Sequence, residues 1–144
     1  MFKLAFAVIL VAIFSIVIAP MLRHVPTVEV TDCSLTSNTI ANDGLTTITF
    51  SLVSNVKDGS HEIRVEFSSH PLVTFMLGSQ NLPKEKNVWY YTETLNPSAS
   101  HTQSINVRAS LESGIAKLDY RITVNFYMDG VQFHNKNLDL TVQR

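Results

Sequence analysis

Five histidines are the first residues of this 144-residue chain that suggest chemistry, namely His24, His61, His70, His101 and His134. None belongs to an H-x-H or H-E-x-x-H pattern, and the chain has no C-x-x-C pair. His61, His101 and His134 fall near the expected ends of strands or at turns, so a metal site would require these three residues to converge in space. Exposed polar positions are the more usual place for histidine. We therefore predict no bound metal and no other cofactor.

Nucleophilic and acid–base chemistry also lack an assembled motif. No G-x-S-x-G turn is present, and each of the five glycines fits a turn or a break better than a phosphate-binding loop. The acidic residues are spread over different segments without a close carboxylate pair. Cys33 is the one cysteine, so it cannot form an intramolecular disulfide, and its alternating segment predicts a small buried hydrophobe. We predict that the chain is not an enzyme.

Two further groups of residues are weaker candidates for a ligand site. Asn42, Asp43 and Asp58 lie in loops that could meet around calcium at one end of a β-structure, although such residues also form turns for backbone reasons. Trp89, Tyr90 and Tyr91 are the one aromatic cluster, and period two sends Trp89 and Tyr91 to one face and Tyr90 to the other. We expect one face to be core and leave the other open to a sugar or protein contact.

Length and charge limit the classes of protein that this chain can form. Setting aside residues 1–26 leaves 118, which is one domain and long enough to fold around a core without disulfides. This body carries 9 basic and 12 acidic residues, a net charge of −3, and its basic residues are scattered singly. A nucleic-acid binder concentrates Lys and Arg on one face, so we exclude that class.

Residues Leu4 to Leu22 form a run of nineteen residues without charge, long enough for a helix to cross the hydrocarbon core of a membrane. Two interpretations remain: an uncleaved anchor over residues 1–25, or a cleaved secretory signal that ends at Val17-Ile18-Ala19. Pro20 favours the anchor, because proline removes the amide and fixes the backbone where signal peptidase needs an extended bond.

The charges that flank this run predict its orientation. Lys3 and the α-amino group lie on one side, against Arg23 on the other, which places the N-terminus inside. We expect a single-pass protein of the cell membrane that contacts lipid through residues 4–22. Its domain of residues 26–144 would then be extracytoplasmic.

From residue 27 on, apolar residues alternate with polar ones, the pattern of strands with one buried face. Asp-Gly occurs at residues 43–44, 58–59 and 129–130, each between alternating runs, and Asp-Gly favours tight hairpins. No helical stretch intervenes, which indicates an antiparallel β-sandwich of about seven or eight strands. The predicted strands are Thr27–Leu35, Leu45–Asn55, His61–Ser68, Asn87–Thr94, Thr102–Ser110, Leu118–Met128 and Leu138–Gln143, with Leu72–Leu77 as the eighth.

Two stretches carry a resemblance to a known family. Leu95-Asn96-Pro97-Ser98-Ala99-Ser100 followed by Gln103 to Val107, and Ser113-Gly114 followed by Leu118 to Val124, resemble the corresponding strands of CARDB-like immunoglobulin-like domains. Such domains are common on archaeal and bacterial cell surfaces, and the resemblance covers residues 28–142. It implies an immunoglobulin-like fold and an extracytoplasmic role in adhesion, spacing or assembly.

The leading hypothesis is therefore a membrane-anchored structural or interaction protein with a protein partner at the membrane or cell surface. The alternative is an accessory subunit, ligand-binding or metal-binding, of a membrane enzyme complex. Small residues on one stripe of the membrane segment would suit that alternative, since they let another helix approach closely: Ala5, Ala12, Ser15 and Ala19.

One segment does not alternate and is the candidate for partner binding, with Leu72, Val73, Phe75, Met76 and Leu77 as its apolar residues. A strand there would be apolar on both faces, which a two-layer structure does not normally hide. Either the segment is buried as core or it presents an apolar edge that accepts a strand from a partner.

Overall fold

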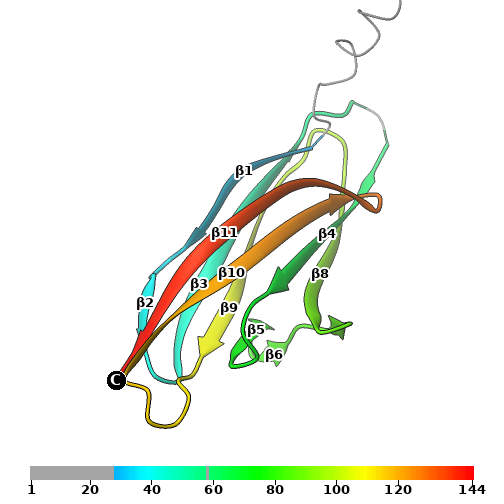
Figure 1. Cartoon of the computed structure of the whole chain (residues 1–144). Helices are drawn as coiled ribbons and strands as arrows, with labels where there is room; N and C mark the ends of the chain where they lie inside the picture. Colours follow the sequence, from blue (N-terminus) through cyan, green and yellow to red (C-terminus); the bar gives the residue numbers. More distant parts are fainter. Residues whose placement is uncertain (1–27, 58) are drawn as a thin grey trace, which may run out of the picture.

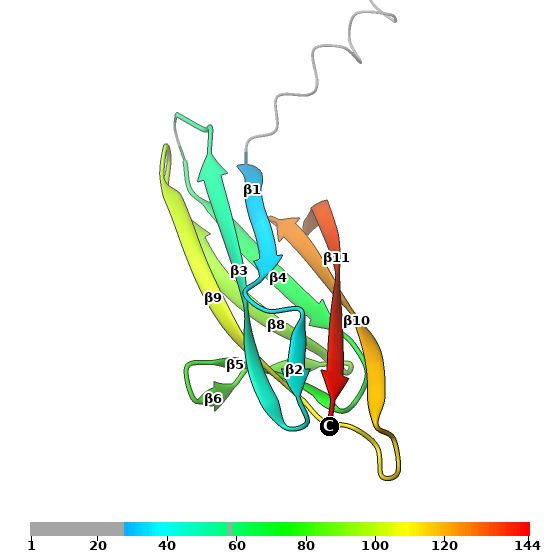
Figure 2. The ribbon, with the colours of Figure 1, turned by 90° about the vertical axis from the view of Figure 1, so that its left-hand side faces the viewer.

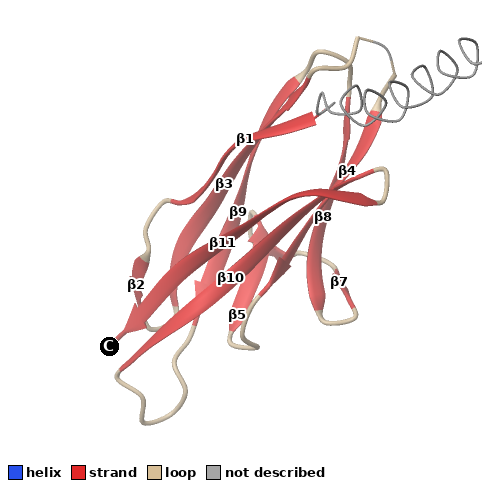
Figure 3. Ribbon diagram, turned by 45° about the horizontal axis from the view of Figure 1, so that its top comes forward, coloured by secondary structure: helices blue, strands red, loops and turns tan. Residues whose placement is uncertain are grey.

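The computed structural model describes residues 28–57 and 59–144, and all of their regular structure is β-strand (Figures 1 and 3). The prediction of an all-β body is thereby confirmed. Within these ranges no helix is present that is long and apolar enough to cross a membrane, and the predicted span over residues 4–22 lies outside them. The strands are β1 (Val28–Leu35), β2 (Thr39–Ala41), β3 (Gly44–Ser54), β4 (His61–Ser68), β5 (Val73–Leu77), β6 (Gln80–Asn81), β7 (Lys84–Glu85), β8 (Val88–Leu95), β9 (Ser100–Ala109), β10 (Lys117–Met128) and β11 (Val131–Gln143).

These strands form two sheets. One sheet has the order β1-β3-β9-β5-β6, and the other has the order β2-β11-β10-β4-β8-β7. All pairs of neighbours are antiparallel except β2 and β11, which are parallel. The chain leaves the first sheet after Leu35 and joins the second at Thr39, so β1 and β2 lie on different sheets (Figure 2).

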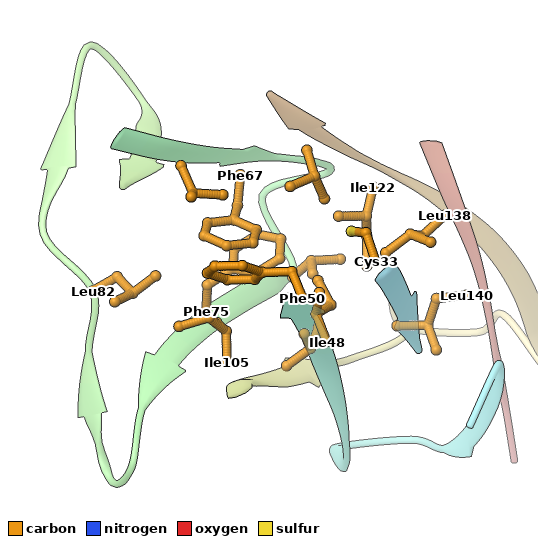
Figure 4. Packing of buried hydrophobic residues seen from close by; sticks show 14 of the residues in the cluster. Cys33, Ile48, Phe50, Phe67, Phe75, Leu82, Ile105, Ile122, Leu138 and Leu140 are labelled. Atoms are coloured by element: carbon orange, nitrogen blue, oxygen red, sulfur yellow. The ribbon is translucent and has the colours of Figure 1, made fainter. Parts of the chain in front are cut away.

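The two sheets pack face to face around one hydrophobic core (Figure 4). Alternate residues of the long strands point inward, as in β3, where Ile48, Phe50 and Leu52 are buried. Phe67 of one sheet stacks on Phe75 of the other with ring centroids 5.3 Å apart. Each large side chain buried in this way contributes roughly 1.5–3 kcal/mol to the free energy of unfolding.

Two of the three predicted Asp-Gly turns lie within the described residues. Asp129 and Gly130 join β10 to β11 with φ angles of 48° and 84°, the left-handed conformation that a tight hairpin requires. Asp43 has a φ angle of 61° and precedes β3, while Gly44 is needed for space, because a Cβ there would lie 2.7 Å from the Ala41 carbonyl oxygen.

The predicted strands correspond to β1, β3, β4, β5, β8, β9, β10 and β11, with one large error of extent. The last strand begins at Val131, seven residues before the predicted Leu138. Three short strands, β2, β6 and β7, were not predicted, and they have two or three residues each.

Candidate functional site

The four histidines of the described chain lie apart, and three of them sit beside a carboxylate. His61 Nδ1 is 2.6 Å from Asp129 Oδ2, His101 Nε2 is 2.7 Å from Glu93 Oε2, and His70 Nε2 is 3.5 Å from Glu112 Oε1. His134 instead packs against the ring of Phe126. Residues 28–57 and 59–144 contain no group of three or more histidine, cysteine or acidic side chains that could hold a metal ion.

The His61–Asp129 pair fastens the β10–β11 hairpin to the start of β4. Asp129 Oδ1 also accepts a hydrogen bond from the Glu62 amide at 3.0 Å, and its own amide donates to the Glu62 carbonyl at 2.9 Å. The hydrogen bond from His61, followed by that from the Glu62 amide, holds the pKa of Asp129 below its usual value. This arrangement positions a turn.

The loops proposed for calcium do not meet. Asn42 and Asp43 precede β3, whereas residues 57 and 59 follow its far end, and the eleven residues of β3 span about 35 Å. Asn42 Oδ1 accepts from the Leu111 amide at 2.7 Å, and Asp43 accepts from the Ser110 hydroxyl. Asn42 and Asp43 therefore serve turn formation, the more usual role of such residues, and Asp58 itself lies outside the described residues.

The aromatic cluster divides between the two faces of β8 as predicted. Trp89 and Tyr91 pack against the core, while the Arg64 guanidinium lies 4.0 Å above the ring of Tyr90 on the outer face. Arg64 also donates to Glu66 Oε1 at 3.0 Å. Tyr90 is thus covered in part by an ion pair.

Most of the candidate partner-binding segment is buried. Val73, Phe75 and Met76 are buried in or beside the core, and Leu72 is half-buried. The outer side of β5 is also covered, since the Leu82 amide donates to the Phe75 carbonyl at 2.9 Å and β6 pairs with Met76 and Leu77. Leu77, with 43% of its surface exposed, is the accessible apolar residue of this segment.

On the β8–β9 side of the sandwich, polar side chains of the two sheets are in contact and close the space between the sheets. The Tyr91 hydroxyl of β8 donates to Glu93 Oε2 at 2.9 Å and lies 3.2 Å from Gln103 Oε1 of β9, which belongs to the opposite sheet. His101 of β9 reaches Glu93 at ion-pair distance without forming an aligned hydrogen bond. Burial, followed by the hydrogen bond to Glu93 and then the Glu93 charge, raises the pKa of Tyr91 to about 12, so its hydroxyl stays a donor at neutral pH.

The opposite side is open, and we call it the β1–β11 seam. It is the space between residues 28–33 of β1 and residues 132–136 of β11, which lie at neighbouring edges of the two sheets (Figure 2). Three adjoining hollows of about 470, 420 and 220 Å³ follow it, and His134 lines all three. Val28, Val30 and Phe133 give the largest hollow an apolar floor, while Glu29 and Thr31 stand on its rim.

The seam also exposes the backbone of β11. Among the described strands, β2 is the outer neighbour of β11, and it pairs with Thr141–Gln143 alone. The Thr141 amide points outward, because it donates to the Asn38 carbonyl at 2.8 Å. Backbone groups alternate sides along a regular strand, and the β10–β11 register is unbroken from Gln143 to His134, so the amides and carbonyls of Asp139, Asn137 and Asn135 point outward too.

Cys33 lines the smallest hollow but is not poised to react. Burial raises the pKa of its thiol to about 11, the Asp32 charge adds to this, and Lys136 opposes it. Because the thiolate is the nucleophile, a thiol with this pKa is nearly inert at neutral pH. The expectation of a small buried hydrophobe is confirmed.

Comparison with known proteins gives a fold and no family. No family model matches the sequence, and no curated protein matches it. Two solved structures superpose with a TM-score of 0.50 and 10% identity. One is the Pseudomonas fluorescens alkylpurine DNA glycosylase AlkC bound to DNA with an abasic site analog, where the match covers 82% of this chain and 31% of that one. The other is the Bacillus subtilis sporulation control protein Spo0M, with 83% and 51% covered.

A third structure, a Niemann-Pick type C2 protein from the Japanese carpenter ant, superposes over 84% of this chain and 96% of that one with a TM-score of 0.42 and 11% identity. This chain spans about a third of the length of the AlkC protein and about half of the length of Spo0M. At these identities the similarity concerns the fold alone.

Proposed function

We propose that this chain is a membrane-anchored, extracytoplasmic interaction protein whose immunoglobulin-like β-sandwich binds a protein of the membrane or cell surface through the β1–β11 seam. Residues 4–22 would be the anchor, and the proposal assigns no reaction to the chain. Two mostly antiparallel sheets, with a chain that passes from one sheet to the other between β1 and β2, support the immunoglobulin-like assignment.

The observation that carries this proposal is the difference between the two sides of the body. Side chains of both sheets meet on the β8–β9 side, where Tyr91, Glu93 and Gln103 are in contact. On the β1–β11 side an apolar floor and a free strand edge stay accessible. Accessible strand edges and apolar hollows are the features through which β-proteins bind other chains.

The experiment uses the full chain, purified in mild detergent from the membranes of its natural host, and measures the mass of the assembly. Thr31→Trp places an indole at an exposed position of the seam, and Thr102→Trp is its matched control on the outer face of β9. We expect Thr31→Trp to reduce the assembly to the single chain and Thr102→Trp to leave it intact. Equal behaviour of the two variants would overturn the seam as the binding site.

The anchor is tested separately by intact mass. We expect the chain from isolated membranes to retain Met1 or Phe2. A mature N-terminus at Pro20 or later would mean that the segment is a cleaved signal.

A further inference from the structure

In the first half of β11, the row of side chains that faces the other sheet is polar instead of apolar. In the second half of the strand, Leu138, Leu140 and Val142 point into the core and are buried. Two and four residues earlier the same row continues with Lys136 and His134, which are both exposed and line the seam. The inner face of β11 is therefore not covered by the opposite sheet there, and it faces an unfilled space.

The backbone of β11 beside this space has outward-pointing groups that can pair with another strand. Asn135, Asn137 and Asp139 each direct one amide and one carbonyl outward, in line with the position that β2 occupies farther along. Because β2 already adds to this edge over three residues, an extended segment above it would continue the same ladder. Side chains on one face of that segment would enter the hollow of about 470 Å³ over Val28, Val30 and Phe133.

A second copy of this chain fits the edge poorly. Phe133 lies at a break in the β10–β11 register, and the exposed Lys136 points inward along the edge. Bulges and inward-pointing charges are devices that prevent one edge from pairing with its copy. The occupant must therefore bring a regular, extended backbone of its own.

The place where the chain enters the body indicates where that occupant is found. Val28 lies beside Ser54, at the end of the body that also holds the β10–β11 hairpin, and the hollow begins there. The position of the occupant then rests on the proposed anchor. The chain from Leu22 to Val28 can span at most about 20 Å. A segment in the seam therefore lies close to the membrane surface, within reach of a stretch that adjoins another protein's membrane span.

We propose that the β1–β11 seam accepts an extended segment, adjacent to the membrane span of a partner protein, that adds as a strand to the outward backbone of Asn135, Asn137 and Asp139. Every second side chain of that segment is apolar and faces Val28, Val30 and Phe133. The segment's other side chains face solvent. Basic residues at the ends of the segment complement Glu29 and Asp32, which form no ion pair with another described residue.

The test uses the full chain in nanodiscs and a probe peptide with blocked ends, Lys-Thr-Val-Thr-Val-Thr-Val-Lys, with binding followed by fluorescence anisotropy. Asn135→Pro removes one outward amide and leaves the β10–β11 ladder complete, since proline is tolerated on an edge strand. Thr92→Pro is the matched control on the free edge of β8, where the Tyr90 amide points outward to the Pro83 carbonyl and Thr92 follows two residues later. Asn135→Ala tests the side chain alone.

We expect the peptide to bind the wild-type chain, Thr92→Pro and Asn135→Ala alike, and Asn135→Pro at least about tenfold more weakly, since a lost hydrogen bond and the added ring act together. A peptide with N-methyl groups on alternate residues should not bind. Equal binding by Asn135→Pro, or binding of the methylated peptide, would overturn strand addition.

The outcomes separate this inference from the function on which it rests. One outcome is that Thr31→Trp dissociates the native assembly, while Asn135→Pro neither dissociates it nor weakens peptide binding. The seam then binds a partner by another mode, and strand addition is wrong. If neither variant changes the assembly, the proposed function fails as well. An assembly made of two copies of this chain, sensitive to Asn135→Pro, would overturn the choice of occupant.

Discussion

At the scale of single residues, most described side chains of the types that could do chemistry serve the fold. Three histidines pair with carboxylates, Asn42 and Asp43 satisfy backbone and hydroxyl groups across a turn, and Cys33 is buried. Sequence motifs could not reveal these roles, because the partners lie far away along the chain, as Asn42 and Leu111 do.

The thiol of Cys33 gives a prediction of reactivity. Because its pKa is raised to about 11 from an ordinary value of 9.0, its thiolate fraction at pH 8 is roughly 100-fold lower than that of a free cysteine. We expect alkylation by iodoacetamide to be slower by about that factor in the folded chain than in urea. Equal rates in the folded and unfolded chain would contradict the buried position.

The pair formed by His61 and Asp129 gives a prediction of pH dependence. The folded-state pKa of Asp129 lies below its ordinary value of 3.8, so the carboxylate stabilises the fold above that pH, and this stabilisation is lost as the pH falls through the lower, folded-state value. Asp129→Asn keeps a residue that tolerates the positive φ angle. Its urea unfolding midpoint should lie below that of the wild type at pH 7 and approach it at the lowest pH. A constant gap would contradict this assignment.

At the scale of elements, alternation identified the strands whose inner face is covered by the other sheet. It missed Val131–Asn137 because His134 and Lys136 occupy the inner row, and these side chains are polar where no opposite strand covers them. The lost pattern is thus itself a consequence of the open seam. β2, β6 and β7 were missed because two or three residues cannot show a period, and the closing contacts of Tyr91, Glu93 and Gln103 depend on which strands the fold brings together.

The segment around β5 gives a prediction at this scale. Phe75 is fully buried against Phe67 and Trp89, whereas Leu77 is exposed. Phe75→Asp should reduce the free energy of unfolding by at least about 4 kcal/mol, since it removes a buried ring and buries a charge. Leu77→Asp should change it by less than about 1 kcal/mol. Chemical denaturation of the two variants checks this, and a folded, stable Phe75→Asp chain would show that β5 is not core.

At the scale of the whole molecule, the entry point of the chain and the open seam lie at the same end. Val28 pairs with Ser54, and Val53 pairs with Ser100. Asp129 contacts Glu62. The loops β3–β4, β8–β9 and β10–β11 therefore lie at the end of the body where β1 begins (Figure 1). With the proposed anchor at residues 4–22, a tether entering there would present the seam close to the membrane. The proposal therefore places the partner at the membrane as well.

Amide hydrogen exchange of β11 tests the central claim most directly. In the isolated full chain, the account predicts fast exchange at Asn135, Asn137 and Asp139 and slow exchange at Lys136 and Leu138, whose amides face β10. In the native assembly the three outward amides should become as slow as their neighbours. Slow exchange at Asn135, Asn137 and Asp139 already in the isolated chain, or unchanged fast exchange in the assembly, would contradict a seam that opens for a partner strand.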